Sequence, residues 1–275
     1  MTNIAVGVIG ATSMVGHYAL TELVNTHNSV IAYSRSVKDP YNDSQGVSWF
    51  GFSGNAAPDR TQPKIESWLC FCPITALPDH FEMLERAGAR KVVALSSTSR
   101  FTKAAGAAGL NATEIALSKQ LEKSEAQFEA WASSKGINWV ILRPTLIYDF
   151  VRDKNLRHIK HFISKAGFFP LLVEAKGLRQ PVYAGDIANA SIAVLRTPSA
   201  QNTDYNLSGG EALPYREMVG RIFSSLGREP KFYKVPMSAF WLALFFARLI
   251  PRYRHLSVAM AERMEFDMVF GHKKA

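Results

Sequence analysis

Cysteine is scarce in this sequence. Among 275 residues it occurs only as Cys70 and Cys72, one residue apart in WLCFCPI. Two cysteines that close in the chain do not easily form a disulfide, and a pair lacks the further ligands of a zinc site. With 47% hydrophobic residues, a chain of this length buries a large core without disulfides. We therefore expect both cysteines to be buried strand residues, and we expect no metal site.

Long apolar runs are also absent. The strongest one, residues 239–247, is far shorter than the ~20 residues that a membrane span needs. Apolar alternation starts at Ile4, which indicates that no signal peptide precedes the first strand, so we expect a cytoplasmic protein. Because arginines follow the run, two alternatives stay open for residues 239–254. They pack against the sheet, or they make a peripheral membrane contact with the arginines near lipid phosphates.

Dense runs of lysine and arginine are missing too, although the net charge is +9 and the isoelectric point is about 9.6. No recognisable nucleic-acid module accompanies this charge. Basic surfaces also attract anionic small molecules, so the composition favours a phosphate-bearing ligand over nucleic acid.

Strands and helices alternate through residues 1–150. Hydrophobic periodicity predicts strands at 4–9, 29–34, 47–52, 67–72, 91–96 and 139–142, with helices at 15–25, 79–87 and 111–131. Such alternation predicts an α/β fold, a Rossmann-type doubly wound parallel sheet with right-handed crossovers. We expect residues 1–150 to form this domain, which the glycine-containing turn GATSMVG marks as NAD(P)-binding.

The alternation breaks after Pro144. Helices are expected at 155–165, 186–195 and 215–226, with short strands at 181–183 and 205–207. Residues 151–275 are therefore expected to form a smaller mixed C-terminal substrate lobe, interleaved with the core in one compact unit.

The turn after the first strand has the features of a dinucleotide-binding turn. IAVGVIGATSMVGHYAL places Gly10, Ser13 and Gly16 between a strand and a helix. Phosphate binding there needs a tight turn and a helix N-terminus whose N–H groups face the anion. Ser13 replaces the middle glycine of the usual pattern but keeps a backbone N–H and adds a hydroxyl. The alternative is a plain strand–helix turn.

The second strand ends in AYSRS, without the acid that commonly binds the adenosine ribose of NAD. Arg35 stands at that position, and arginine suits a 2′-phosphate. We therefore expect NADP(H) to be preferred, with NAD(H) also open.

Five motifs, GATSMVG, VVALSSTS, INWVILRPTLIYD, LRQPVYAGDIANA and YNLSGGEALPYREMV, follow one another along nearly the whole chain. Together they resemble an atypical, extended short-chain dehydrogenase/reductase of the NAD(P)-dependent epimerase/dehydratase-like group, often called nucleoside-diphosphate-sugar epimerases. The resemblance implies the fold. It does not fix the reaction, because this superfamily includes epimerases, dehydratases, reductases and proteins without known turnover.

The resemblance also implies positions for the site residues. Those near the cofactor would be Gly10, Thr12, Ser13, Met14, Val15, Ser34, Arg35, Cys72, Pro73, Ile74, Ser96, Ser97, Thr98, Pro144, Thr145 and Leu146. Those near the substrate would be Tyr148, Arg179 and Gln180, to which the basic segment after residue 149 adds Arg152 and Asn155. Arginine suits the pyrophosphate of a nucleotide sugar, while a solvated basic helix is the alternative.

The tyrosine that serves this family as a base is missing. In the family a lysine four residues later lowers the pKa of that tyrosine. The helix expected at 111–131 contains no tyrosine in any register. Counting back from Lys119, from Lys123, or from Glu125 as the acid that often follows, the tyrosine position holds Ile115, Lys119 or Leu117.

Other groups remain as candidates for chemistry. Thr98 and Ser97 follow the fifth predicted strand, where a hydroxyl orients a substrate oxygen, although a serine-rich turn is the alternative. Lys103 could transfer protons if desolvation lowered its pKa, although a solvated loop lysine is the alternative.

Two functions therefore stay open: an NAD(P)-dependent oxidoreductase or epimerase-like enzyme acting on a nucleotide-linked sugar or similar carbonyl, or a non-catalytic NADP-binding sensor or assembly protein of the same fold. Relatives often pair through helices, which leaves a homodimer open.

Overall fold

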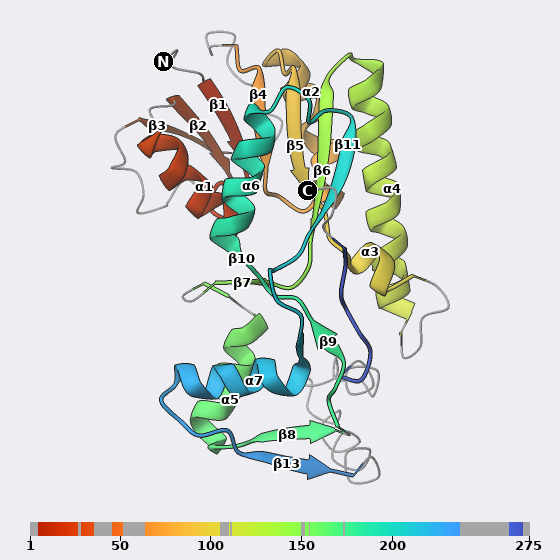
Figure 1. Ribbon diagram of the computed structural model, residues 1–275. Coiled ribbons are helices and arrows are strands. Elements are labelled where there is room, and N and C mark those ends of the chain that lie inside the picture. The colour runs from red at the N-terminus through yellow and green to blue at the C-terminus, as the bar shows by residue number, and fades with distance from the viewer. Residues whose placement is uncertain are drawn as a thin grey trace.

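A computed structural model describes residues 5–26, 29–35, 46–51, 64–104, 110, 112–149, 152–153, 155–172, 174–236 and 264–271. The sheet and its helices lie above a smaller lobe in the view of Figure 1. Residues 239–254, expected either to pack on the sheet or to touch a membrane, lie outside the described residues.

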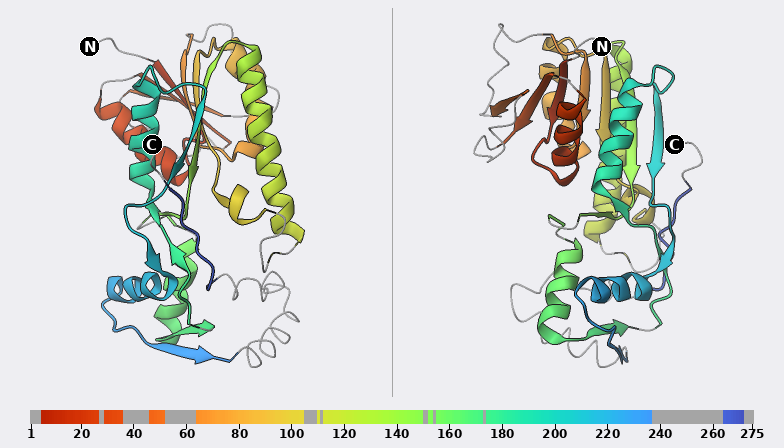
Figure 2. Two further views of the ribbon diagram at one scale, coloured as in Figure 1. Left: turned by 45° about the vertical axis from the view of Figure 1, so that its right-hand side comes forward. Right: turned by 60° about the vertical axis from the view of Figure 1, so that its left-hand side comes forward.

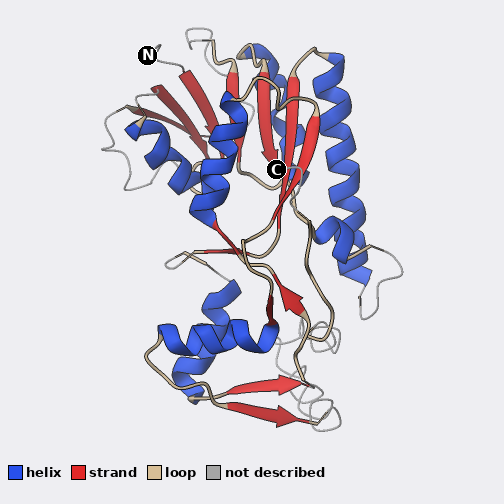
Figure 3. Cartoon of the chain, in the orientation of Figure 1, coloured by secondary structure: helices blue, strands red, loops and turns tan. Residues whose placement is uncertain are grey.

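The first half of the chain builds most of a parallel sheet (Figure 3). Its strands are β1 (Ala5–Ile9), β2 (Ser29–Ser34), β3 (Val47–Gly51), β4 (Ser67–Cys70), β5 (Lys91–Leu95) and β6 (Asn138–Pro144). The intervening helices are α1 (Met14–Asn25), the 3₁₀ helix η1 (Ile74–His80), α2 (Phe81–Arg86), α3 (Ser99–Thr102) and α4 (Ala112–Ser134).

The second half both forms the lobe and returns to the sheet. After β7 (Ile147–Tyr148) come α5 (Asn155–Ala166), β8 (Phe169–Leu172), β9 (Leu178–Arg179) and β10 (Val182–Tyr183). Next are α6 (Ala184–Arg196), β11 (Thr203–Leu207), β12 (Leu213–Pro214), α7 (Tyr215–Ser225) and β13 (Phe232–Val235). We expected a short strand near 205–207 as part of the lobe. Instead β11 pairs in parallel with β6 and completes a seven-stranded sheet of order β11-β6-β5-β4-β1-β2-β3. The predicted Rossmann-type fold is confirmed.

Alternating side chains build a core on each face of the sheet. Along β5, Val93 and Leu95 join the core under α1 and α6, whereas Val92 and Ala94 join the core under α2 and α4. Successive residues of a strand point to opposite faces, so near-continuous apolar strands are needed where helices cover both faces. A third cluster, including Ile163 and Phe223, forms the separate core of the lobe between α5 and α7.

Two predicted boundaries were wrong near residue 72. The strand expected to end at Cys72 ends at Cys70, because Pro73 lacks an N–H for the ladder and caps η1. Cys70 is buried in the strand as expected, but Cys72 is only partly buried and lies beyond it. The helix expected from residue 79 starts as η1 at Ile74 and becomes α-helical at Phe81.

Candidate functional site

The order of the strands creates a topological switch point beside β1, the position that open α/β sheets use as a ligand crevice. The chain passes from β1 to β2 on one side and later to β4 on the other, so the connections diverge at the carboxyl ends of β1 and β4. In open α/β sheets ligands bind at such a switch point. The turn from β1 to α1 lies there, as do the ends of the strands that the sequence marks as the site.

Glycine is required at two positions of this turn. Gly10 has φ +75°, and a Cβ there would lie 2.5 Å from the backbone nitrogen of Cys72. A Cβ at Gly16 would lie 2.5 Å from the carbonyl oxygen of Gly10. Backbone atoms cannot yield as a flexible side chain does, so these glycines allow β1, α1 and the end of β4 to meet.

The N-terminus of α1 suits an anion. Ser13 is its N-cap, and the Ser13 hydroxyl accepts a hydrogen bond from the backbone N–H of Gly16 at 3.0 Å. First-turn N–H groups have no partner inside their helix, and the helix dipole adds positive potential. The first turn of α1 holds no acidic residue that would oppose an anion. Ser13 thus replaces a glycine without blocking the turn.

The end of β2 adds a cation beside this turn. The hydroxyls of Thr12 and buried Ser34 are 3.3 Å apart, which joins the turn to β2. Arg35 follows and is exposed. Burial raises the pKa of the Cys72 thiol to about 11, while the charge of Arg35 opposes that rise. Arg35 therefore lies close enough to the end of β4 for its charge to act on the Cys72 thiol.

The serine cluster at the end of β5 is mostly engaged within the protein. Thr98 is 6% exposed, and its hydroxyl donates to the carbonyl oxygen of Pro144 at 3.2 Å. The Ser97 hydroxyl accepts from the N–H of Ser99 at 3.1 Å, and the Ser96 hydroxyl donates to Glu125. These bonds hold the turn against β6 and α4, and the half-exposed Ser97 is the more accessible of the predicted catalytic pair.

A buried ionic network, formed by Ser96, Arg100, Glu125, Arg143 and Asp204, stands behind this turn. The Glu125 carboxylate on α4 accepts two hydrogen bonds from Arg143 Nε, at 3.0 and 3.1 Å, and one from its Nη2 at 2.7 Å. Arg100 also donates to Glu125, and Arg143 donates to Asp204 on β11. Burial alone would lower the pKa of Arg143, but its bonds to Glu125 and the charges of both acids raise it.

The face that α4 turns to the sheet offers no acid–base pair. Its buried residues are Ser118, Leu121, Ser124, Glu125, Phe128 and Ala132. Lys119 and Lys123 are both exposed. Neither lysine is placed to lower the pKa of a group at the edge of the sheet. Leu117, which the Glu125 register puts at the tyrosine position, is 36% exposed.

Three tyrosines do lie near the site, between α1, β7 and β10. The Tyr18 hydroxyl donates to Asp149 Oδ1 at 2.9 Å, and the ring centroid of Tyr183 lies 5.2 Å from that of Tyr18 and 5.6 Å from that of Tyr148. The hydrogen bond with Tyr183, burial and Asp149 together raise the pKa of Tyr18, and burial followed by the Asp186 charge raises that of Tyr148. A tyrosine base needs the opposite shift.

Lys103 lies beyond α3 with its Nζ 3.9 Å from Glu114 Oε1. Its side chain is 24% exposed and that of Glu114 is 12% exposed. The lysine is therefore neither fully solvated nor desolvated, but partly covered beside a carboxylate.

The chain leaves β6 through the residues predicted to flank the nicotinamide. Pro144 is buried, the Thr145 hydroxyl donates to the carbonyl oxygen of Gln180, and the Leu146 carbonyl oxygen accepts from the N–H of Val182 at 2.9 Å. The bonds tie this segment to the strand entering α6. They fix its backbone at the edge of the sheet.

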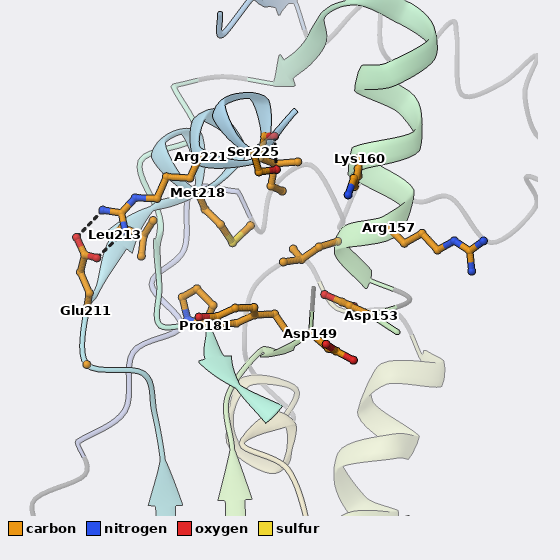
Figure 4. Close-up of a pocket in the computed structure, with 14 residues that line it drawn as sticks. Asp149, Asp153, Arg157, Lys160, Pro181, Glu211, Leu213, Met218, Arg221 and Ser225 are labelled. Atoms are coloured by element: carbon orange, nitrogen blue, oxygen red, sulfur yellow. Dashed lines mark hydrogen bonds and ion pairs between the residues drawn. The ribbon is translucent and has the colours of Figure 1, made fainter. Parts of the chain in front are cut away.

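A cavity of about 900 Å³ opens between α5 and α7 (Figure 4). Tyr148 and Asp149 line it on the side of the sheet. The remaining lining residues are Asp153, Leu156, Arg157, Lys160, Pro181, Gly210, Glu211, Leu213, Met218, Arg221, Ile222 and Ser225. The lining includes three acids and three bases, and Arg221 already pairs with Glu211 and Glu217. In Figure 4, Arg157 extends away from α7. The cavity is amphipathic rather than simply basic.

Among the predicted substrate residues whose side chains the structure describes, Tyr148 alone lines this cavity. Arg179 donates to the carbonyl oxygens of Leu178 and Phe266 at 2.9 Å, and its guanidinium lies over the Tyr215 ring. Gln180 bonds Gly209 and Phe270. Both side chains thus fasten the segment 264–270 to the lobe.

The other two predicted residues lie close in the sequence to the lining residues Asp149, Asp153 and Leu156. The Arg152 N–H donates to Asp149 at 3.1 Å, and Asn155 begins α5. Sequence reasoning missed Glu211, Met218 and Arg221, because α7 approaches α5 only through the fold. The basic spacing of Arg157 and Lys160 was the available signal.

Within the described residues, no group of three histidine, cysteine, aspartate or glutamate side chains could hold a metal ion. No described helix has the length and apolar character to cross a bilayer.

Comparisons with known proteins separate sequence from fold. No family model matches the chain. A 97-residue stretch is 29% identical to NADH dehydrogenase (ubiquinone) 1 alpha subcomplex subunit 9, mitochondrial, of Arabidopsis thaliana, covering 35% of this chain. The match spans about a quarter, 24%, of that protein's length.

Solved structures resemble almost the whole chain. UDP-N-acetylglucosamine 4-epimerase from Bacillus cereus has a TM-score of 0.65 and 17% identity, over 85% of this chain and 86% of that one. UDP-glucose 4-epimerase from Thermus thermophilus, in complex with NAD, has a TM-score of 0.63 and 17% identity, over 85% of this chain and 86% of that one. dTDP-glucose 4,6-dehydratase from Bacillus anthracis, also in complex with NAD, has a TM-score of 0.63 and 14% identity, over 85% of this chain and 84% of that one. The expected likeness to epimerases and dehydratases is confirmed for the fold.

Proposed function

We propose that this protein binds NADP(H) in the crevice between β1, α1 and β4, with NAD(H) as a weaker ligand. The pyrophosphate would lie at the N-terminus of α1, and Arg35 would pair with the 2′-phosphate. Support comes from the close approach at Gly10 and Gly16, the Ser13 cap and the absence of an acid in the first turn of α1. Bound structures with this fold, such as the Thermus thermophilus epimerase, hold NAD.

We further propose that the protein holds its cofactor without epimerase-type turnover. One observation carries this: the face of α4 toward the sheet presents Ser118, Leu121 and Glu125, and both of its central lysines are exposed. Removing a hydroxyl proton before hydride transfer needs a base whose pKa lies near the operating pH. The tyrosines at the edge have raised pKa values instead. A nicotinamide would supply hydride chemistry, but these residues lack the proton acceptor that accompanies it.

An assembly or sensing role follows for a cofactor that is bound but not consumed. The partial relative is a subunit of a mitochondrial NADH dehydrogenase. A ligand that binds only the folded state stabilises that state by mass action. The stability of the protein would therefore rise with the concentration of NADP(H). An ordered surface around the cofactor could then present a partner site.

The test combines binding with turnover. Isothermal titration should show NADPH binding to the intact protein, and a thermal scan should show a higher Tm with saturating NADPH. The same protein, incubated with UDP-glucose, UDP-N-acetylglucosamine or dTDP-glucose and NAD(P), should give no change in absorbance at the nicotinamide band and no epimer by chromatography. Substrate-dependent nicotinamide reduction, or an epimerised product, would refute the non-catalytic proposal while leaving cofactor binding intact.

A second function is favoured by the cavity between α5 and α7. At about 900 Å³ it is large enough for a nucleotide-linked sugar, and Tyr148 joins it to the edge of the sheet. In that case Ser97 would orient the substrate oxygen and Lys103 would move the proton. Turnover by the wild type that survives Lys103→Met would eliminate the lysine. A large loss that is restored by Lys103→Arg would assign it a charge rather than proton transfer.

A further inference from the structure

The net positive charge lies entirely in the second part of the chain. Residues 1–150 hold 13 basic and 13 acidic side chains, whereas residues 151–275 hold 19 basic and 10 acidic ones. The net charge of +9 therefore belongs to residues 151–275, which include the whole lobe. Within the lobe, α5 holds Arg157, Lys160 and Lys165 and no acid, and such an excess of positive charge attracts an anionic partner.

Aromatic rings gather at the end of the lobe away from the sheet. Phe162 on α5 packs edge-on against Phe168 at 5.8 Å between ring centroids, and Phe168 packs edge-on against Tyr233 on β13 at 4.9 Å. Phe162 is 40% exposed and Tyr233 is 60% exposed. Monomeric proteins carry single exposed aromatics without consequence, but a contiguous group marks a contact site. We call these three residues the aromatic cluster.

Two exposed lysines flank the aromatic cluster. Lys165 lies three residues after Phe162 on the exposed side of α5, so the two side chains are neighbours on the helix. Lys231 precedes β13, and its carbonyl oxygen accepts from the N–H of Phe169 at 2.9 Å. Both lysine side chains are exposed, and Glu229 is a nearby exposed acid. Lys234 is paired with Glu174, so it adds little net charge.

This surface is separate from the cofactor crevice. Both views of Figure 2 place α5, β8 and β13 at the opposite end of the molecule from β1 and β2. The cavity between α5 and α7 uses Arg157 and Lys160, not the three aromatics. Neither the proposed cofactor binding nor the cavity accounts for the cluster.

We propose that the aromatic cluster, with Lys165 and Lys231, docks the lobe onto the surface of an anionic lipid bilayer. Aromatic rings favour the headgroup level of a membrane, and flanking lysines gain from anionic lipid. Single-stranded nucleic acid fits less well, because stacked bases need open ring faces and here edge-on neighbours cover them. Few aromatics and few lysines give a weak, reversible contact that orients the cofactor crevice away from the bilayer.

Vesicle co-flotation of the full-length protein tests this. Vesicles of phosphatidylcholine with phosphatidylglycerol should carry the protein to the top of the gradient, and vesicles of phosphatidylcholine alone should not. Phe162→Ser/Tyr233→Ser should lower the partition coefficient by roughly tenfold through lost interfacial burial. Lys165→Glu/Lys231→Glu should lower it by at least about tenfold. The second pair replaces only exposed side chains, so it keeps the test valid if the first pair fails to fold.

Matched controls carry the same changes elsewhere. Leu117→Ser and Lys123→Glu alter exposed residues of α4, outside the aromatic cluster, and should leave flotation unchanged. No flotation of the wild type with anionic vesicles overturns the proposal. So does flotation that survives both pairs of substitutions, because the contact would then lie elsewhere in the chain. Retention on an acidic protein surface or RNA without flotation would assign the lysines to a different class of partner.

Discussion

Glu125 and Arg143 form a buried ion pair, with Arg143 Nη2 2.7 Å from Glu125 Oε2 and side chains only 2% and 7% exposed. The pair joins α4 to the end of β6 directly before Pro144. Ser96 and Arg100 bind the same carboxylate. The serine turn, the exit from β6 and the helix that lacks a tyrosine are thereby fixed relative to one another.

Glu125→Ala should destabilise the protein by about 3–5 kcal/mol, because it leaves Arg143 charged and buried without its main partner. Urea unfolding followed by circular dichroism measures the change in the free energy of unfolding. The matched control is Glu122→Ala on the same helix, where the exposed carboxylate is 3.4 Å from Arg100. It should cost no more than about 1 kcal/mol. Equal losses of stability in the two variants would contradict the inference that Glu125 is the main partner of the buried Arg143.

Gly16→Ala should cost about 1–3 kcal/mol and weaken NADPH binding, since the added Cβ would lie 2.5 Å from the Gly10 carbonyl oxygen. Alanine gains about 1 kcal/mol in helix propensity over glycine. The clash should outweigh this gain because α1 has to move as a whole. Thermal melts and NADPH titration measure both effects. Gly210→Ala, where no atom lies within 4 Å of the new Cβ, should change neither.

Arg35→Gln should weaken NADPH binding by at least about tenfold, which corresponds to the loss of one charge-assisted hydrogen bond of about 1.5–3 kcal/mol. Binding of NADH, which has no 2′-phosphate, should change much less. Titration of both nucleotides against both proteins gives the selectivity directly. Arg90→Gln removes another exposed arginine, at the opposite end of the strands, and serves as the control. A parallel loss for NADH and NADPH would show that Arg35 does not read the 2′-phosphate.

Cys72 should react slowly with iodoacetamide at neutral pH. Burial raises its pKa from 9.0 to about 11, so at pH 8 the thiolate fraction is roughly a hundredfold below that of an ordinary thiol. Mass spectrometry of the alkylated protein measures the alkylation rate at several pH values from about 7 to about 11, a range that includes both pKa values. A rate plateau near pH 9 would contradict the burial. NADPH should slow the reaction further, since Cys72 lies in the proposed crevice.

The raised pKa of Cys72 also makes the free energy of unfolding depend on pH. The pKa of the Cys72 thiol is higher in the folded chain than in the unfolded chain. Between pH 9 and about 11 the unfolded state therefore binds fewer protons than the folded state. Stability is therefore fully present below pH 9 and falls as the pH rises through that window. Cys72→Ala should flatten this decline, as measured by urea unfolding at several pH values.

Local signals predicted the elements and failed for the long-range partners. The side chains of β5 that alternate between the two faces of the sheet, and the glycines of the first turn, are close neighbours in the sequence. The sheet and the α1 crevice could therefore be predicted. The bonds of Arg179 and Gln180 to residues 264–270 could not, because they join segments almost 90 residues apart. The position of Thr98 directly after a strand predicts a place at the site. Sequence could not reveal that its hydroxyl donates to Pro144, since that bond depends on how β5 and β6 align.

The return of β11 to the edge of the sheet has a consequence for synthesis of the chain. When residues 1–150 have left the ribosome, β6 is complete and apolar, but its open edge has no neighbour until residues 203–207 emerge. An unpaired hydrophobic edge recruits other strands, so the nascent intermediate is the aggregation-prone species. A chaperone that holds the chain through this interval, rather than one that acts after release, should raise the soluble yield.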